Sequence, residues 1–134
     1  MRYLLDTHIL LWALSNDYQL PPKARMIIED DDNNIYYSVI SIWEVALKHT
    51  AHPAQLTLTA REASGYCQMA GFKRLLLEDK HIFYVDSLYR PDDAPAHKDP
   101  FDRILISQAK AEGFLFLTHD QLLLDYGEPC LIYV

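Results

Sequence analysis

Short apolar runs alternate with helix-like segments along this chain, and that alternation constrains the fold more than any other feature. The runs that are typical of strands are residues 2–5, 35–39, 72–77, 114–117 and 131–134. Strands that are apolar almost throughout and are separated by helices indicate a parallel sheet covered on both faces. The sequence therefore predicts an α/β fold: a three-layer α/β/α sandwich with a mostly parallel, four- to five-stranded central sheet.

Helix signals fill the intervals between these runs. The predicted helix starts are Asp6 or Thr7, Pro21-Pro22, Ser41 with Glu44 as a capping box, Thr59 with Glu62 as a second capping box, and Asp99-Pro100. Gly71 and Gly113 are predicted to end two of these helices. Residues 78–88 and 119–126 are predicted to form shorter helical segments.

Length and charge limit the class of protein. The 134 residues predict a single domain, 1–134, and a net charge of −7 argues against a broad basic face that coats nucleic acid. An enzyme that meets phosphates through bound cations is still allowed, because the acids that hold the metal add to the negative total. Cys67 and Cys130 form no CxxC motif, no signal peptide is visible, and no apolar run reaches the roughly 18 residues of a membrane span. A cytoplasmic protein is expected.

Four acidic residues lie where a predicted strand ends or where the next helix begins: Asp6, Glu44, Asp102 and Asp120. In an open parallel sheet these points share one edge, the crevice outside the carboxyl ends of the strands. Carboxylates gathered there repel one another unless a cation or protons intervene. Several carboxylates, completed by water and phosphate oxygens, suit Mg²⁺ or Mn²⁺. The pattern therefore predicts a divalent metal site that can activate water against a phosphodiester.

Each acid also has a structural interpretation, because acids favour helix N-termini. Glu44 could complete a capping box with Ser41, and Asp99 is a good N-cap. Capping does not require an acid after several separate strands, so the joint pattern favours the metal site. Asp99 is expected to be structural or to support the site, because an N-cap directs its carboxylate at backbone N–H groups.

Four segments of the chain resemble the acidic motifs of PIN domains. They are Leu4-Leu5-Asp6-Thr7-His8, Ser41-Ile42-Trp43-Glu44-Val45, His97-Lys98-Asp99-Pro100-Phe101-Asp102-Arg103 and Leu117-Thr118-His119-Asp120. More narrowly, essentially the whole chain resembles the VapC-type toxin ribonucleases of bacterial toxin–antitoxin pairs. The resemblance implies a Mg²⁺- or Mn²⁺-dependent endoribonuclease, an RNA substrate, a homodimer and a cognate antitoxin that blocks the site. It also implies that Asp6, Glu44, Asp102 and Asp120 are the metal-binding and catalytic acids.

Other polar residues lie beside these motifs. Thr7 and Thr118 could hydrogen-bond a site carboxylate or a metal-bound water, or could simply cap a helix. Arg103 and Lys98 could contact RNA phosphate. Lys48 lies one helical turn after Glu44 and favours an i,i+4 ion pair with it.

Most alternative functions are less well supported, because each of these requires residues that this chain lacks. A phosphatase with an aspartyl nucleophile wants a second Asp two residues after the first, where this chain has His8. A receiver-like module needs paired acids and a late lysine that are not evident. A zinc site at His49 and His52 lacks completing ligands and meets Pro53. A non-catalytic PIN-like scaffold that binds a protein or RNA partner remains the main alternative, although none of the four acids is missing.

Overall fold

The computed structural model describes residues 1–97 and 99–134, and its strands form one five-stranded sheet. The strands are β1 (Arg2–Leu5), β2 (Asn34–Ser38), β3 (Lys73–Leu75), β4 (Leu115–Thr118) and β5 (Leu131–Tyr133). Their order in the sheet is β3-β2-β1-β4-β5, and every neighbouring pair is parallel. The predicted mostly parallel sheet of four to five strands is confirmed.

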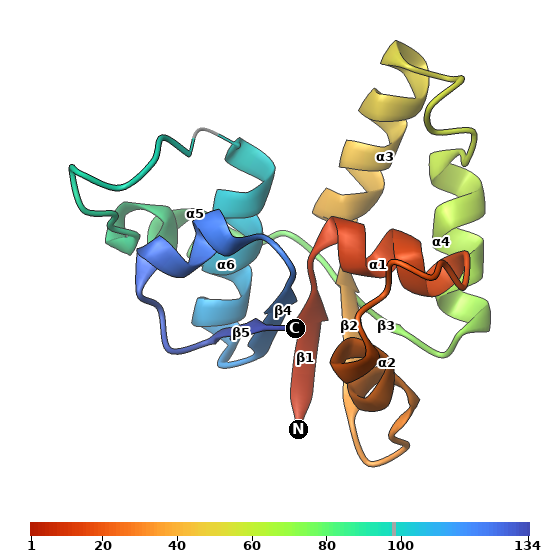
Figure 1. The fold of residues 1–134 in the computed structure, drawn as a ribbon, viewed down its shortest axis with the longest axis horizontal. Helices are drawn as coiled ribbons and strands as arrows, with labels where there is room; N and C mark the ends of the chain where they lie inside the picture. Colours follow the sequence, from red (N-terminus) through yellow and green to blue (C-terminus); the bar gives the residue numbers. More distant parts are fainter. Residues whose placement is uncertain (98) are drawn as a thin grey trace.

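Helices cover both faces of this sheet (Figure 1). They are α1 (Thr7–Leu14), α2 (Pro22–Glu29), α3 (Val39–Ala51), α4 (Ala60–Met69), α5 (Asp79–Phe83) and α6 (Pro100–Glu112), with 3₁₀ helices η1 (Tyr84–Ser87) and η2 (Gln121–Tyr126). The helices α1, α2 and α4 lie on one side, and α5 and α6 lie on the other. Helix α3 continues directly from the end of β2 and extends beyond the sheet, where α4 packs beside it. The predicted α/β sandwich is confirmed.

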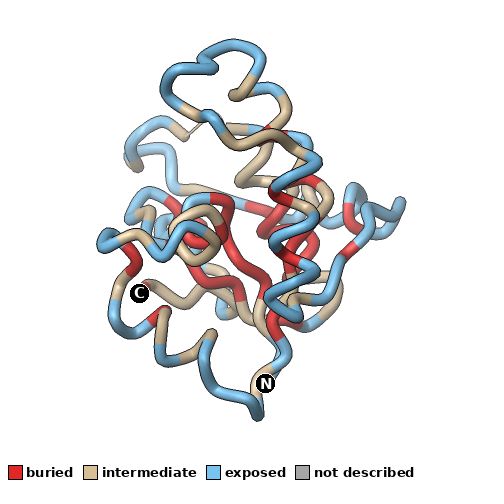
Figure 2. The backbone as a smooth tube through the Cα atoms, turned by 90° about the vertical axis from the view of Figure 1, so that its right-hand side faces the viewer, coloured by how far each residue is buried: buried red, intermediate tan, exposed pale blue. Residues whose placement is uncertain are grey.

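The core consists of two apolar clusters separated by the sheet. Successive residues of a strand point to opposite faces, and Leu4 accordingly packs against α6 while Leu5 packs against α1. Phe116 and Leu117 divide in the same way on β4. All four side chains are fully buried, and the buried residues concentrate in the central strands (Figure 2). Burial on both faces explains why these strands are apolar along their whole length.

The predicted capping box of Ser41 and Glu44 is wrong. Helix α3 begins at Val39, and its N-cap is Ser38, whose hydroxyl accepts a hydrogen bond from the backbone N–H of Ile40 at 3.0 Å. Ser41 therefore lies inside the helix and is buried. The β-branched Val39 favoured continuing the strand in the sequence, but the hydroxyl of Ser38 satisfies a free N–H and starts the helix earlier.

Other boundaries agree with their sequence signals or differ by a few residues. The Thr59–Glu62 capping box is present, and Asp99 caps α6, which ends at Gly113 with a φ of 71°. The third strand is shorter than predicted, and the segment after His119 is 3₁₀ rather than α-helical. Among the described residues, no helix is both long and apolar enough to cross a membrane.

Candidate metal centre

Asp6 lies at the carboxyl end of the central strand and is the N-cap of α1. Its Oδ1 accepts a hydrogen bond from the backbone N–H of Thr7 at 2.7 Å, and its Oδ2 accepts one from the Thr118 hydroxyl at 2.7 Å. Only 4% of the residue is exposed. Burial raises the pKa of Asp6 to about 6, although the hydrogen bonds from Thr118 and Thr7 and the neighbouring His8 oppose the rise. A carboxylate is therefore held here at an electrostatic cost.

Thr118 connects Asp6 to the second acid of the same edge, Asp120. The Thr118 hydroxyl donates to Asp6 and accepts a hydrogen bond from the backbone N–H of Asp120 at 3.0 Å. Asp120 follows β4, which pairs with β1, and its Oδ1 caps η2 by accepting from the N–H of Leu122 at 2.9 Å. Of the roles left open for Thr118 in the sequence, the structure shows the hydrogen bond to a carboxylate.

Glu44 is carried to the same edge by α3. Its side chain is buried, and Oε2 lies 2.6 Å from the ammonium of Lys48, which confirms the predicted i,i+4 ion pair. The other oxygen, Oε1, is buried and has no hydrogen-bond partner among the described residues. A buried carboxylate oxygen without a donor is costly, because it has lost water and gained nothing in exchange. A cation bound at this edge would give this oxygen a partner.

Asp102 lies in the first turn of α6 and has the most strongly perturbed carboxyl group of the edge. Burial, followed by the negative charges of Asp6, Asp99, Glu44 and Asp120, raises the pKa of Asp102 to about 8. Four separate segments of the chain therefore bring their carboxyl groups within range of one another's charges. Of the four predicted acids, Asp102 and Asp120 offer ligand atoms within 4.8 Å of each other and of His97, whereas Asp6 and Glu44 lie outside that group of described residues.

These donors fit a divalent cation. The group offers several carboxylate oxygens, one of them without a partner among the described residues, and two carboxyls whose pKa values are raised by burial and like charge. A hard divalent cation would provide the opposite charge and accept oxygen ligands. Protons can also relieve the repulsion, so the protonation of this edge and its occupation by a cation compete with each other.

The remaining residues singled out in the sequence have mainly structural contacts. Asp99 accepts hydrogen bonds from the N–H groups of Phe101 and Asp102 at 2.9 and 3.4 Å, as expected of an N-cap. The Thr7 hydroxyl lies 2.8 Å from the Ser41 hydroxyl and thereby joins α1 to α3, rather than contacting a carboxylate. Arg103 lies over the ring of Tyr126, 5.9 Å from its centroid. Lys98 lies outside the described residues.

His97 and Tyr126 are also part of this edge, although neither was predicted to be a site residue. His97 Nε2 lies 3.2 Å from Asp102 Oδ2, and His97 Nδ1 lies 2.7 Å from the Tyr126 hydroxyl. Burial and the nearby Arg90 lower the pKa of His97. The one available signal was that His97 opens the third acidic motif, two residues before Asp99. Nothing in the sequence connects it to Tyr126.

A second group of possible ligand atoms, from Glu78, His81 and Glu112, is already satisfied within the protein. His81 Nδ1 accepts from the backbone N–H of Glu78 at 3.0 Å, and its Nε2 lies 2.8 Å from Glu112 Oε1. Lys80 lies 2.9 Å from the same Glu112 oxygen. These contacts tie α5 to α6, and the lysine supplies the positive charge that a cation would bring. The group is therefore structural.

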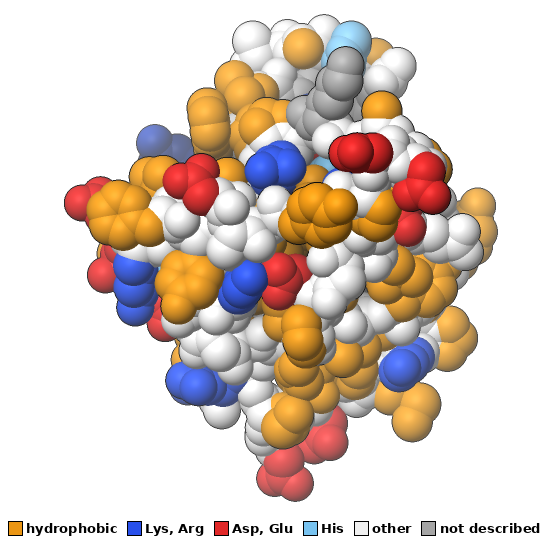
Figure 3. Space-filling view, turned by 90° about the vertical axis from the view of Figure 1, so that its left-hand side faces the viewer, with side chains coloured by type: hydrophobic (Ala, Val, Ile, Leu, Met, Phe, Trp, Pro, Cys, Tyr) orange, Lys and Arg blue, Asp and Glu red, His pale blue; other side chains and the backbone are white. Residues whose placement is uncertain are grey.

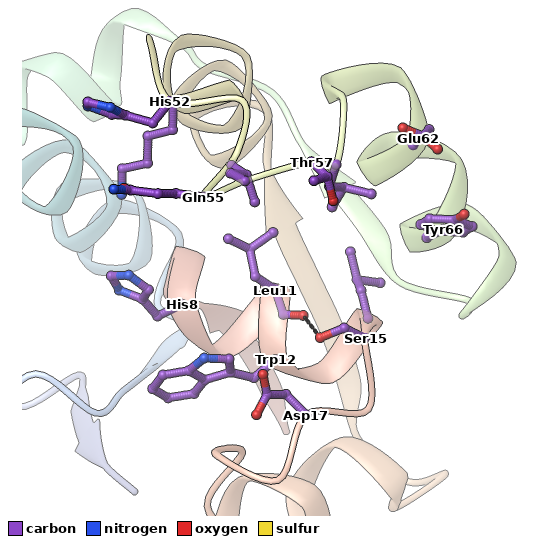
Figure 4. Close-up of a pocket in the computed structure, with 14 residues that line it drawn as sticks. His8, Leu11, Trp12, Ser15, Asp17, His52, Gln55, Thr57, Glu62 and Tyr66 are labelled. Carbon is purple, nitrogen blue, oxygen red and sulfur yellow. Dashed lines mark hydrogen bonds between the residues drawn. The ribbon is translucent and has the colours of Figure 1, made fainter. Parts of the chain in front are cut away.

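A groove of about 800 Å³ begins beside the acidic edge and runs between α1 and the segment after α3 (Figure 4). Its lining is mostly apolar on the α1 side, with Leu11 and Trp12, and it includes Leu56 and Tyr66 opposite. Figure 4 shows Leu11 pointing across the groove toward the segment that carries Gln55 and Thr57. His8 and Lys48 also line it, so the groove is continuous with the neighbours of Asp6 and Glu44.

Comparison with known proteins agrees with this geometry. No curated protein sequence matches. Solved structures that share the fold at low identity include VapBC2 from Rickettsia felis bound to a DNA fragment from its promoter, with 18% identity, a TM-score of 0.66, and coverage of 100% of this chain and 98% of that chain. A toxin–antitoxin complex from Klebsiella pneumoniae has 17% identity and a TM-score of 0.61, and covers 97% of this chain and 95% of that chain. DNA-bound VapBC from Salmonella typhimurium has 14% identity and a TM-score of 0.63, and covers 100% of this chain and 97% of that chain. The PIN domain profile matches residues 3–129. The chain therefore belongs to the PIN domain family.

Proposed function

We propose that this protein is a metal-dependent endoribonuclease, the toxin of a toxin–antitoxin pair, whose divalent cation is held by Asp6, Glu44, Asp102 and Asp120. The observation that supports it most is the raised pKa of Asp102, which follows first from burial and then from the negative charges of Asp6, Asp99, Glu44 and Asp120. Membership of the PIN domain family and the likeness to toxin–antitoxin structures also support this proposal. We further propose that the whole chain, 1–134, is one such domain.

Different residues of the chain have different roles in the proposed reaction. A bound Mg²⁺ or Mn²⁺ supplies the charge that activates water and offsets the charge developing on the phosphodiester. Thr118 fixes the orientation of Asp6 and the start of η2, so that carboxyl groups after two neighbouring strands are held in place and would be available to the cation. Lys48 holds Oε2 of Glu44 and leaves Oε1 for the cation. The sheet edge thus holds the ligands in position before the substrate binds. Such preorganisation is usually a large part of an enzyme's rate enhancement.

Aromatic side chains beside the acids support a single-stranded RNA substrate. Trp43 precedes Glu44 on α3, is 56% exposed, and packs edge-on against Phe101 with ring centroids 5.0 Å apart. Unpaired bases stack on such exposed rings without requiring a basic surface. Because the chain carries a net charge of −7, we expect RNA affinity to depend on the cation and on stacking rather than on bulk attraction.

We propose that a segment of the antitoxin occupies the groove of about 800 Å³ next to the acids. An apolar segment would cover Leu11, Trp12 and Leu56, and a chain lying there would pass His8 and Lys48 on its way to the metal centre. Its binding would block RNA access without any change in the carboxylates. Leu11→Glu should abolish complex formation with the neighbouring gene product while RNA cleavage by the isolated chain persists.

We also propose a homodimer. The segment 76–89 exposes several large apolar side chains: Leu76, Ile82, Phe83, Tyr84 and Tyr89. Figure 3 shows the face that carries α5, where hydrophobic side chains gather between scattered charged ones. Exposed apolar patches of this kind mark interfaces. Light scattering should give twice the mass of the chain, and Phe83→Glu should give a monomer, whereas Tyr18→Glu, at a 94% exposed position outside the segment, should not change the mass.

RNA cleavage by the purified chain tests the proposed activity. We expect cleavage with Mg²⁺ or Mn²⁺, none with EDTA, and none for Asp6→Asn or Asp102→Asn when circular dichroism confirms folding. Asp31→Asn, in an exposed loop, is the matched control and should cleave at the parent rate. Cleavage that persists in EDTA would contradict the metal mechanism. A folded, metal-binding chain that cleaves no RNA would favour a scaffold that only binds a partner.

A further inference from the structure

His97 places a nitrogen donor among the acids of the metal centre. One possible ligand atom each from His97, Asp102 and Asp120 lies within 4.8 Å of the others. Adjacent ligands of an octahedral ion at about 2.1 Å are roughly 3 Å apart. The 3.2 Å between His97 Nε2 and Asp102 Oδ2 matches that separation. A cation that binds Asp102 would therefore lie within bonding reach of the imidazole.

The opposite side of the imidazole is built to hold it in this orientation. His97 Nδ1 lies 2.7 Å from the Tyr126 hydroxyl, and the two rings meet at right angles with centroids 5.5 Å apart. A histidine that binds a metal through one nitrogen usually donates from the other to a fixed oxygen. In the tautomer that donates Nδ1–H to Tyr126, the lone pair of Nε2 points toward Asp102.

Tyr126 is itself fixed by two cations. The Arg90 guanidinium lies over its ring at 5.2 Å, and Arg90 is anchored by Asp125 at 3.1 Å. Arg103 Nη1 lies 3.5 Å from the Tyr126 hydroxyl and donates to its oxygen. The oxygen has a second lone pair, which can accept from His97 Nδ1–H. The side chain of His97 is 4% exposed, so its orientation is set by these contacts rather than by water.

We infer that His97 is a direct nitrogen ligand of the divalent cation, through Nε2, and that it makes the site prefer Mn²⁺ to Mg²⁺. The inference rests on the proposed metal centre and deepens it. Imidazole binds later transition metals more strongly than Mg²⁺, which prefers oxygen ligands alone. A mixed set of carboxylate oxygens and one imidazole nitrogen therefore discriminates between the two ions, whereas four carboxylates would not.

Mn²⁺ added to the metal-free full-length chain provides the test, with pulsed electron paramagnetic resonance to detect directly bound ¹⁴N. We expect nitrogen coupling in the parent protein and in His119→Gln, whose histidine packs on Tyr133 beside the site, and none in His97→Gln. Tyr126→Phe keeps the ligand and loses its orienting partner, so coupling should persist while Mn²⁺ affinity falls on the order of 10-fold. Mg²⁺ should compete better in His97→Gln than in the parent.

The outcomes separate this inference from the proposed function. Mn²⁺ that binds the parent protein without nitrogen coupling, and that is lost in Asp102→Asn, would overturn the role of His97 and leave a metal centre of oxygen ligands. Nitrogen coupling that survives in His97→Gln would also overturn it. Failure of the parent protein to bind Mn²⁺ would overturn both. If His97→Gln does not fold, a parent spectrum without nitrogen coupling still overturns the inference, and Tyr126→Phe still tests it through the fall in Mn²⁺ affinity.

Discussion

Replacing Asp102 by asparagine should stabilise the metal-free protein at high pH, although it removes an acid proposed to be essential. The folded protein raises the pKa of Asp102 from 3.8 to about 8. Between these two pH values the folded state keeps a proton that the unfolded state has lost. The free energy of unfolding of the parent protein must therefore fall as the pH rises through that window. The asparagine side chain carries no charge, so the variant lacks this loss.

The size of the effect follows from the same pKa. From pH 5 to about 8 the parent loses roughly 1.4 kcal/mol per pH unit through this one group, or about 4 kcal/mol in total. Comparing two pH values cancels the pH-independent consequences of the substitution. Urea unfolding in EDTA at pH 5, 7 and 9 should show the variant gaining relative to the parent by this order of magnitude.

Asp31→Asn is the control, because Asp31 lies in an exposed loop away from the acids, and its difference from the parent should stay constant with pH. A relative gain for Asp102→Asn of less than about 1 kcal/mol between pH 5 and 9 would refute the reasoning. That result would mean that water or relaxation already screens the four carboxyl groups from one another.

Three further substitutions test other parts of the structure by urea unfolding. Thr118→Val leaves Oδ2 of Asp6 without its donor and should cost about 1–3 kcal/mol, whereas Thr118→Ser should cost much less; equal losses would contradict the hydroxyl's role. Ser38→Ala removes the cap of α3 and should cost about 1–2 kcal/mol, and no loss would place the helix start elsewhere. Leu117→Ala should cost about 2–5 kcal/mol because that side chain is fully buried, and a smaller cost would question the packing of β4.

The parts of the fold that depend on local patterns were predictable from the sequence. Strands buried on both faces must be apolar throughout, which marks 114–117 without knowledge of its neighbours. Helix α6 has an N-cap at Asp99 and a glycine stop at Gly113, and both signals act within the helix itself. The predicted start of α3 was wrong because Ser38 and Ser41 are equally good N-caps in the sequence. Where the strand β2 ends in the sheet decides which of the two serines caps the helix.

The acids of the candidate site were predictable because a parallel sheet collects the ends of its strands at one edge. The roles of their neighbours were not. Thr118 and Thr7 follow or precede site acids in the same way, yet of their two hydroxyls only that of Thr118 hydrogen-bonds a carboxylate. His97 and Tyr126 are 29 residues apart and meet only through tertiary packing. Contacts of this kind leave no periodicity or spacing in a single sequence.

A crystal grown with Mn²⁺ and measured at wavelengths that reveal manganese by anomalous scattering tests the central claim most directly. We expect one strong peak among the carboxyl groups of Asp6, Glu44, Asp102 and Asp120, at about 2.1 Å from the carboxylate oxygens that bind it. Manganese found only elsewhere, such as beside His81 and Glu112, would contradict a metal centre at the carboxyl edge of the sheet, and so would a crystal with no bound manganese.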